Sequence, residues 1–153
     1  MIFLLRHAKA GDRSQWSGDD RLRPLSRAGH AQAFALVDQL ASTPFERIVS
    51  SPYVRCMETV VPLAGARGVA IEPSDALAEG APLHEALALM GKHMEHGAVL
   101  CTHGDIVPMV LSHLAANGVA VDPDPRWPKG STWVLETTGA DIVAARYLPP
   151  PVE

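Results

Sequence analysis

The pattern of apolar and polar positions along the chain predicts short strands that alternate with helices. Two runs are continuously apolar and stop abruptly at a histidine-containing polar segment, which is typical of strands buried on both faces of a sheet. Shorter apolar runs predict further strands, and a hairpin turn at residues 138–141 is expected to join the last two. The predicted strands are residues 1–5, 47–50, 69–72, 98–102, 132–137 and 142–147.

Helical spacing follows most of these strands. Ser26 is suited to cap a helix that runs to about Leu40. Ser51-Pro52 is a typical helix start, because proline fits the first helical position. Two more helices are predicted at about 83–96 and after Asp105 to about Ala116. The apolar stripe expected on the first helix consists of Ala33, Phe34, Leu36, Val37 and Leu40.

Alternation of strands and helices predicts an α/β fold, a three-layer sandwich in which helices flank a mostly parallel central sheet. Residues 8–24 and 122–130 are polar or rich in glycine and proline, and we expect loops there. The loop at 8–24 is longer than most connections, which is often a sign of function. We expect a single domain over residues 1–148 and a frayed, proline-rich tail at 149–153.

Composition excludes several classes of protein. With 47% hydrophobic residues among 153, the chain is not a disordered one. A net charge of −4 speaks against a nucleic acid polymer as partner. The apolar runs are too short for a membrane span or a signal peptide, so we expect a cytoplasmic protein without a membrane partner. Cys56 and Cys101 lack metal-ligand spacing, and we expect both in the core.

Charge is distributed unevenly along the chain. The first 27 residues hold six of the 13 Lys and Arg residues and only three of the 17 Asp and Glu residues. Such a concentration of cations in an acidic protein is consistent with an anion site at that end of the chain. The alternative is that these side chains are simply solvated.

Polar residues at the ends of three predicted strands favour the anion site over the alternative of solvated side chains. Arg6-His7 follows the first strand, Ser50-Ser51 ends the second with Arg55 one helical turn further on, and Thr102-His103-Gly104 ends the fourth. If these strands are parallel neighbours, two histidines and two arginines meet at the carboxyl edge of the sheet, where ligands of such sheets bind. Guanidinium groups and helix N-termini both favour phosphate, so a phosphate site is predicted.

Four segments together resemble the histidine phosphatase superfamily, also called phosphoglycerate mutase-like. The resemblance covers residues 1 to about 137, and the Arg-His-Ala form at 6–8 is most similar to SixA-type phosphohistidine phosphatases. Residues 6–23 are also similar to phosphatase domains that follow Nudix hydrolases in some two-domain proteins. The segments are Leu5-Arg6-His7-Ala8, Arg23-Pro24-Leu25-Ser26-Arg27-Ala28-Gly29, Ser50-Ser51-Pro52-Tyr53-Val54-Arg55-Cys56-Met57-Glu58-Thr59 and Thr102-His103-Gly104.

The resemblance implies that His7 is the nucleophile and forms a phosphohistidine, with its second ring nitrogen bonded to a backbone carbonyl. It also implies that Arg6, Arg55 and His103 hold the equatorial oxygens of the phosphoryl group. Ser51 and Gly104, at the same strand ends, are expected to help bind the substrate. The chemistry needs no metal and no cofactor. The alternative for Arg55 is a surface pair with Glu58.

The general acid is expected to be a carboxylate between the two halves of the motif. Glu79 is the best placed candidate, although it is equally well explained as a solvated turn residue. Asp105 is a second candidate, but it is better placed to cap the helix after His103. SixA-type members resemble this chain without a dedicated acid, since a phosphoramidate leaving group needs less help. Glu79 therefore bears on the choice of substrate.

Four further cations, Lys9, Arg13, Arg21 and Arg23, lie on the long loop and are expected to bind a phosphorylated protein surface or the extra phosphates of a nucleotide. The alternative is a solvated face paired with Asp12, Asp19 and Asp20. Trp16 is placed either to stack on a base or to anchor the loop.

The function we expect is that of a metal-independent phosphatase for phosphohistidine in a protein. The alternative is a phosphomonoesterase for a small metabolite or nucleotide. A phosphate-binding regulatory module with an inactive site is the third hypothesis, against which the complete set of Arg6, His7, Arg55 and His103 argues.

Overall fold

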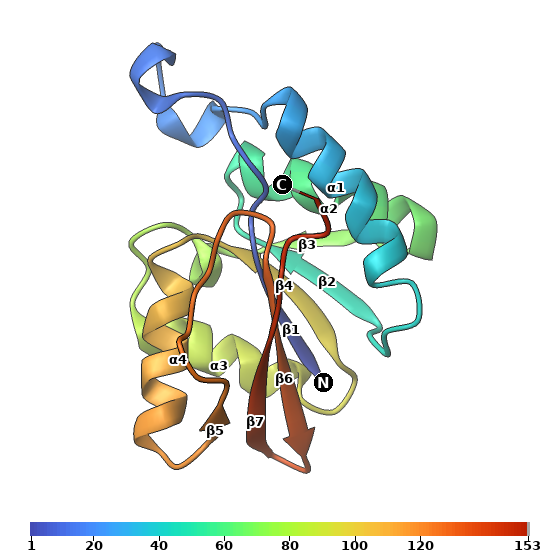
Figure 1. Cartoon of the computed structure of the whole chain (residues 1–153), viewed down its shortest axis with the longest axis vertical. Coiled ribbons are helices and arrows are strands. Elements are labelled where there is room, and N and C mark those ends of the chain that lie inside the picture. The colour runs from blue at the N-terminus through green and yellow to red at the C-terminus, as the bar shows by residue number, and fades with distance from the viewer. Residues whose placement is uncertain (153) are drawn as a thin grey trace.

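The long loop and the strand ends lie together at one end of the molecule in the computed structural model, which describes residues 1–152 (Figure 1). The strands are β1 (Ile2–Arg6), β2 (Arg47–Ser50), β3 (Ile71–Pro73), β4 (Ala98–Thr102), β5 (Ala120–Val121), β6 (Thr132–Thr138) and β7 (Asp141–Leu148). The α-helices are α1 (Arg27–Gln39), α2 (Val54–Arg67), α3 (Leu83–His93) and α4 (Ile106–Ala116). Short 3-10 helices are η1 (Arg13–Gln15), η2 (Asp20–Leu22) and η3 (Asp75–Leu77).

These strands form one mixed, mostly parallel sheet in the order β3-β2-β4-β1-β6-β7-β5. The pairs β1–β4, β2–β4, β2–β3 and β5–β7 are parallel, whereas β6 is antiparallel to β1 and β7. In the parallel register Arg6 lies beside Thr102, and Ser50 lies beside Cys101. The predicted convergence of the three strand ends is therefore confirmed in the fold.

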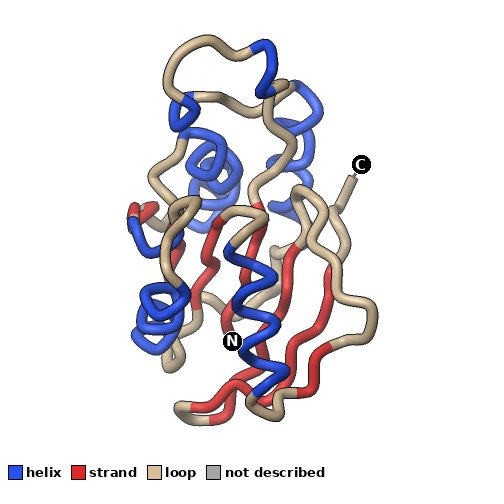
Figure 2. The backbone as a smooth tube through the Cα atoms, turned by 90° about the vertical axis from the view of Figure 1, so that its left-hand side faces the viewer, coloured by secondary structure: helices blue, strands red, loops and turns tan. Residues whose placement is uncertain are grey.

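Helices cover both faces of the sheet, with α1 and α2 on one side and α3 and α4 on the other (Figures 1 and 2). In β1, Ile2 and Leu4 pack into the core on the α3–α4 side, whereas Phe3 enters the core on the α1–α2 side. Both faces of this strand are buried, which explains why its sequence is apolar without alternation. The predicted three-layer α/β sandwich is confirmed.

The first helix begins as predicted, because the Oγ of Ser26 accepts a hydrogen bond from the amide of Gly29. Its buried face differs from the predicted stripe. Ala33 and Leu36 are fully buried, but Phe34 is 69% exposed, so the prediction for Phe34 was wrong. Gln32, a polar residue, is fully buried on this face instead.

Two predicted features near the helix starts differ in detail. The helix after Ser51-Pro52 begins at Val54, and no side chain caps it. Asp105 precedes α4 but makes no capping hydrogen bond. Its Oδ2 accepts from the amide of Gly80, 2.8 Å away, and so holds the turn that carries Glu79. The expectation that Asp105 caps the helix was wrong.

Residues 149–152, where we expected a frayed tail, lie against α1. Gln39 Nε2 donates to the carbonyl of Pro149 at 3.0 Å, and Gln32 Nε2 donates to the carbonyl of Val152 at 3.0 Å. Short β5 was not predicted. Among residues 1–152, no helix combines the length and the apolar character that a membrane crossing requires.

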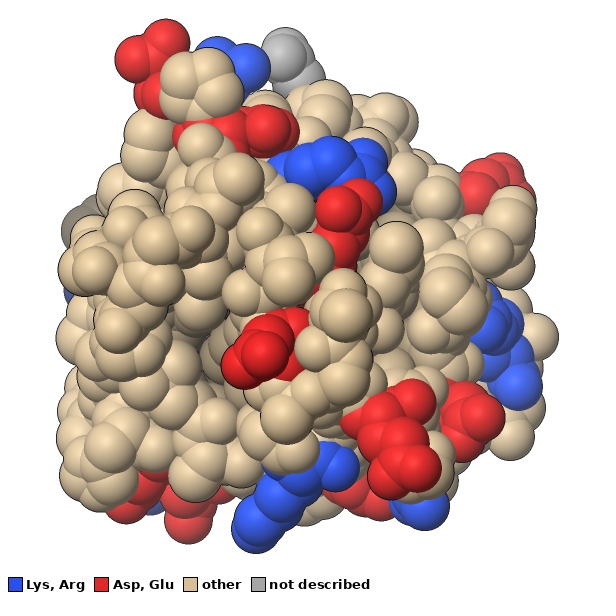
Figure 3. Space-filling model, turned by 90° about the horizontal axis from the view of Figure 1, so that it is seen from below, with Lys and Arg blue, Asp and Glu red and all other residues tan. Residues whose placement is uncertain are grey.

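The amino ends of the parallel strands lie at the opposite end of the molecule from the long loop. This face carries scattered acidic and basic side chains separated by uncharged residues (Figure 3). No single sign of charge dominates the view.

Candidate active site

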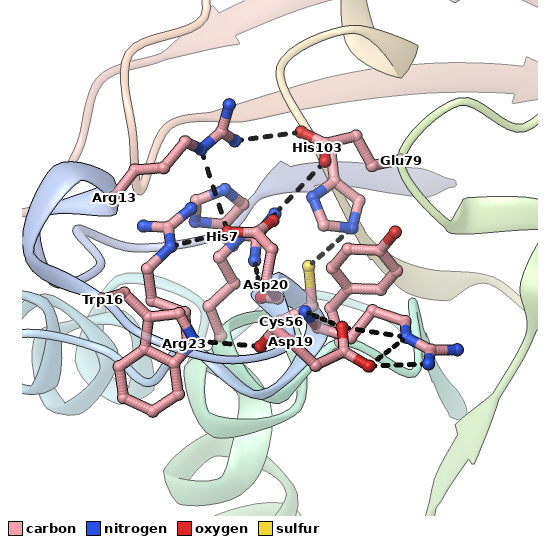
Figure 4. Close-up of polar contacts among 12 residues, drawn as sticks. His7, Arg13, Trp16, Asp19, Asp20, Arg23, Cys56, Glu79 and His103 are labelled. Atoms are coloured by element: carbon pink, nitrogen blue, oxygen red, sulfur yellow. Dashed lines mark hydrogen bonds and ion pairs between the residues drawn. The ribbon is translucent and has the colours of Figure 1, made fainter.

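A pocket of about 560 Å³ opens at the carboxyl ends of β1 and β4. It combines residues that are far apart in the sequence, because the loop after β1, the turn before α3 and the segment before β6 all contribute to its lining. Figure 4 shows Arg13 of that loop beside Glu79 of the turn. Both cations and carboxylates line it. The lining residues are Arg6, His7, Ala10, Gly11, Asp12, Arg13, Arg23, Glu79, Gly104, Asp105 and Lys129.

His7 directly follows β1 and is only 5% exposed. Its Nδ1 lies 2.7 Å from the carbonyl oxygen of Ala8, so this nitrogen carries the proton and donates. The amide of Ala8 donates in turn to Thr59 Oγ1 on α2, at 3.0 Å. This arrangement directs a Nε2 lone pair toward the pocket.

Burial lowers the pKa of His7 to about 3, and the nearby charges of His103, Arg55 and Arg6 act in the same direction. The hydrogen bond to Ala8 opposes the shift without cancelling it. The imidazole is therefore neutral at neutral pH. A neutral ring with one fixed N–H keeps its second nitrogen nucleophilic.

His103 follows β4 and faces His7, with the two ring centroids 5.4 Å apart. Its Nε2 lies 2.8 Å from the Oγ of Ser51, which itself accepts from the amide of Tyr53. Its Nδ1 is buried without a hydrogen-bond partner among residues 1–152. When the Ser51 hydroxyl donates to Nε2, Nδ1 carries the ring proton and can donate into the site.

Arg6 is the last residue of β1, and its Nη1 donates to the carbonyl of Trp127 at 2.8 Å. The side chain lies against Gly104, where an added Cβ would stand 2.6 Å from the Arg6 Cζ. Only glycine at this position leaves room for the guanidinium. Burial lowers the pKa of Arg6, whereas Asp105 raises it.

Arg55, in the first turn of α2, is 1% exposed. Its Nη1 donates to the backbone carbonyl of Asp20 at 2.9 Å, and its Nη2 donates to Asp20 Oδ2 at 3.1 Å. The alternative of a surface pair with Glu58 was wrong. Glu58 instead accepts a hydrogen bond from the amide of Leu25 at 2.9 Å.

Three buried donors around His7 share one property. Arg6 Nε, Arg55 Nε and His103 Nδ1 have no hydrogen-bond partner among residues 1–152. A buried polar atom without a partner is costly and rare in folded proteins. An oxyanion with several acceptor oxygens would satisfy all three donors at once, since charge-assisted hydrogen bonds are strong.

Glu79 lies in the turn after η3 and lines the pocket, and Figure 4 shows its carboxylate directed toward Arg13. Its Oε1 is 3.4 Å from Arg13 Nη2, and its Oε2 is 3.5 Å from Arg55 Nη2. The alternative of a purely solvated turn residue does not describe this placement, since Glu79 contacts a buried arginine. The carboxylate is 39% exposed, which leaves it accessible to solvent protons.

The predicted cationic loop residues separate into different environments. Arg13 and Arg23 line the pocket of His7, but Lys9 lies in a neighbouring pocket. Arg21 lines neither of these two pockets, and its guanidinium pairs with Asp19 at the exposed tip of the loop. The indole of Trp16 donates to the carbonyl of Asp19 at 2.9 Å and so anchors the loop.

Sequence reasoning missed two residues of the site. Asp20 accepts from Arg55 and from Arg23 Nε, the latter at 2.9 Å, and was considered only as a solvated partner. Lys129 lines the pocket from the loop before β6, more than 120 residues from His7. No local sequence pattern predicts the role of Asp20 or of Lys129. Within residues 1–152, no group of three or more His, Cys, Asp or Glu side chains is arranged to hold a metal ion.

Comparison with known proteins agrees with this geometry. A sequence profile of the Histidine phosphatase superfamily (branch 1) matches residues 2–82, which carry His7 and Arg55. The chain belongs to the histidine phosphatase superfamily. This membership confirms the resemblance inferred from the four motif segments.

Individual relatives of this histidine phosphatase differ in their named substrates. An 8-oxo-(d)GTP phosphatase from Mycolicibacterium smegmatis is 34% identical over 157 aligned positions, which cover 99% of this chain and 49% of the relative. The chain thus spans about half the length of that curated relative.

Solved structures resemble this histidine phosphatase over nearly its whole length. The protein histidine phosphatase SixA complexed with tungstate has a TM-score of 0.78 at 15% identity, with 98% of this chain and 96% of that chain covered. A structure described as the putative phosphohistidine phosphatase SixA from Agrobacterium tumefaciens has a TM-score of 0.73 at 25% identity, with 97% and 95% covered.

Proposed function

We propose that this histidine phosphatase hydrolyses nucleotides through a covalent phosphohistidine on His7. The observation that carries the proposal is the position of the Glu79 carboxylate, which lines the same pocket as His7 and lies 3.5 Å from Arg55 Nη2. A carboxyl group in that position can protonate an oxygen leaving group, which a phosphate ester needs and a phosphoramidate needs less.

In the first step, Nε2 of neutral His7 attacks phosphorus in line with the leaving oxygen. The Nε2–P bond forms while the P–O bond to the nucleotide breaks, and the departing oxygen takes a proton from Glu79. Arg6, Arg55 and His103 donate to the equatorial oxygens, where charge is concentrated in the transition state.

In the second step, water attacks the phosphohistidine. The new P–O bond forms as the Nε2–P bond breaks, and the Glu79 carboxylate accepts the proton that water loses. The Nδ1–H of His7 remains bonded to the Ala8 carbonyl in both steps, so the ring keeps its orientation. Inorganic phosphate then leaves and the residues return to their starting protonation states.

A nucleotide is supported by two independent features. The 34% identical relative is named as an 8-oxo-(d)GTP phosphatase and aligns with 99% of this chain. The site also holds a cation beyond the predicted phosphate-binding set, because Lys129 lines the pocket and has no ion-pair partner among residues 1–152, whereas Arg13 and Arg23 pair with Glu79 and Asp20. Extra positive charge suits a substrate with additional anionic groups.

Protein phosphohistidine is the second candidate substrate. Its support is the likeness in fold to the SixA structures, one of which is 25% identical to this chain. In that case the chain would meet a protein surface, and Glu79 would be less important because the leaving imidazole nitrogen is easier to expel.

A substrate panel separates the two candidates. Nucleoside mono-, di- and triphosphates, sugar phosphates and a phosphohistidine-containing protein are compared by kcat/KM, for wild type and for Glu79→Gln. The proposal expects nucleotides to be the best substrates. Nucleoside monophosphates should lose about 10²-fold or more in Glu79→Gln, the usual contribution of a general acid, and di- and triphosphates should lose less because their phosphate leaving group needs less protonation. If only the phosphoprotein is turned over efficiently, and Glu79→Gln does not affect that turnover, the nucleotide proposal is wrong and protein phosphohistidine is the substrate.

A further inference from the structure

A second pocket of about 690 Å³ lies beside the one that holds His7. Arg6 and Lys129 line both pockets, so the two are neighbours that share these side chains. Nothing in the proposed chemistry at His7 uses the second pocket. Its lining residues are Arg6, Lys9, Gln32, Arg126, Pro128, Lys129, Tyr147, Pro149 and Pro150.

The charges of the two pockets differ in kind. The pocket of His7 contains carboxylates as well as cations, whereas no Asp or Glu of residues 1–152 lines the second pocket. Lys9, Arg126 and Lys129 also have no ion-pair partner within the described chain, in contrast to Arg13, Arg21 and Arg23. Among residues 1–152 these three cations have no countercharge, and such an array attracts an anion.

A buried side chain holds two of these cations together. Gln32, which is 0% exposed, accepts from the amide of Lys9 at 2.9 Å and donates to the carbonyl of Lys129 at 3.1 Å. It packs beneath Gly130, where φ is +84° and an added Cβ would lie 3.1 Å from the Gln32 amide. A core side chain therefore fixes the backbone at both lysines, whose side chains line the same pocket.

The third cation is held in place by aromatic residues. The guanidinium of Arg126 lies over the ring of Tyr147, 4.8 Å from its centroid. The backbone carbonyl of Arg126 accepts from Trp133 Nε1 at 2.9 Å. A guanidinium stacked in this way keeps its N–H groups free to donate hydrogen bonds to an anion.

Lys129 connects the two pockets electrostatically. Partial burial lowers its pKa, and Arg6, Arg23, Arg13 and Arg55 lower it further. The ammonium group thus lies in the field of the cations around His7 while its chain also lines the second pocket. A negatively charged substrate that extends across both pockets would relieve this repulsion.

We propose that the pocket formed by Lys9, Arg126 and Lys129 binds the phosphate groups that are not transferred, so that the preferred substrates carry a chain of two or more phosphates. The inference rests on the proposed function, because it narrows the substrate class from nucleotides in general to nucleoside di- and triphosphates. The terminal phosphoryl group lies at His7, and the remaining phosphates extend past Lys129 into the second pocket.

Inhibition by inorganic anions tests the pocket without relying on any nucleotide. Orthophosphate and tripolyphosphate are each tested as competitive inhibitors of aryl phosphate hydrolysis. The ratio of their two inhibition constants is then compared between variants. Lys9→Met, Arg126→Gln and Lys129→Met each remove one cation of the pocket. Lys92→Met, on the exposed face of α3, removes the same charge elsewhere and serves as the matched control.

Wild type and Lys92→Met should both bind tripolyphosphate more tightly than orthophosphate. Each pocket variant should reduce that preference by about tenfold, since a charge-assisted hydrogen bond is lost for tripolyphosphate. No preference in the wild type, or the same preference in all variants, would overturn the inference. If the ratios behave as expected but nucleotides are not hydrolysed, the anion pocket stands and the nucleotide assignment falls.

Discussion

Asp20 accepts two hydrogen bonds from the guanidinium of Arg55. Its backbone carbonyl accepts from Nη1 at 2.9 Å, and its carboxylate accepts from Nη2 at 3.1 Å. Both terminal nitrogens are therefore occupied, and the Nε of Arg55 is left without a partner among residues 1–152. The short η2 helix of the long loop thus fixes the orientation of a buried arginine on α2, and Arg23 supports Asp20 from the other side.

Asp20→Asn should impair this orientation while keeping the backbone contact. We expect kcat to fall by about tenfold with a smaller change in KM, because one charge-assisted hydrogen bond is weakened. Kinetics on an aryl phosphate provide the measurement. Asp19→Asn is the control, since the Asp19 carboxylate bonds only to exposed Arg21 among residues 1–152. Partial rescue by Asp20→Glu would support positioning, and an unchanged kcat in Asp20→Asn would contradict it.

His7→Gln should remove the nucleophile. We expect turnover to fall at least about 10³-fold, the scale seen when a covalent nucleophile is lost. Quenched wild-type enzyme should carry acid-labile, base-stable phosphate, and the variant should carry none. His96→Gln, on an exposed histidine, should label like the wild type. Equal labelling of His7→Gln would place the covalent intermediate on another residue.

The depressed pKa of His7 links folding to pH. The folded state holds this ring neutral down to about pH 3, whereas an unfolded histidine takes up a proton near pH 6.5. The unfolded state therefore binds more protons between these values, and the free energy of unfolding falls as the pH drops through this window. At pH 5 the loss is on the order of 2 kcal/mol for a fully formed shift.

Urea unfolding of wild type and His7→Gln at pH 7 and pH 5 measures this loss. The wild type should lose more stability than the variant between the two pH values. An equal loss would mean that His7 does not carry the linkage. The same neutrality predicts that kcat/KM shows no acid limb from His7 near pH 6.5.

Gly104→Ala should displace the Arg6 guanidinium, because the new Cβ would lie 2.6 Å from Cζ. We expect a loss of about tenfold or more in kcat/KM, since one phosphate-binding group is misplaced. Gly91→Ala on α3 is the matched control, where an added Cβ meets nothing within 4 Å. Its activity should stay at the wild-type level, and its stability should rise slightly. Full activity in Gly104→Ala would show that Arg6 can shift without consequence.

The two apolar residues that sequence periodicity treated alike on α1 should behave differently. Leu36 is fully buried, so Leu36→Ala should cost about 2–5 kcal/mol of unfolding free energy. Phe34 is 69% exposed, and Phe34→Ala should change stability by less than about 0.5 kcal/mol. Denaturant unfolding compares the two. Similar losses would mean that Phe34 is covered in the folded protein.

The local sequence was sufficient for the α/β class, for most strands and helices, and for the residues that end β1, β2 and β4. Its signals were strong because a strand buried on both faces must be apolar throughout, and because polar residues mark where such a strand leaves the core. Together with the four motif segments, these signals predicted the family. They also predicted that Arg6, His7, Arg55 and His103 meet at one edge of the sheet.

Only the tertiary structure decided which other side chains join them. Asp20, Lys129 and Gln32 act through contacts between segments that are distant in the sequence, such as the bonds from Gln32 to Lys9 and Lys129. Phe34 and Leu36 likewise differ because neighbouring elements cover one and not the other. Periodicity and spacing report where a chain turns and which face is apolar, but packing between distant segments determines partners, burial and pKa.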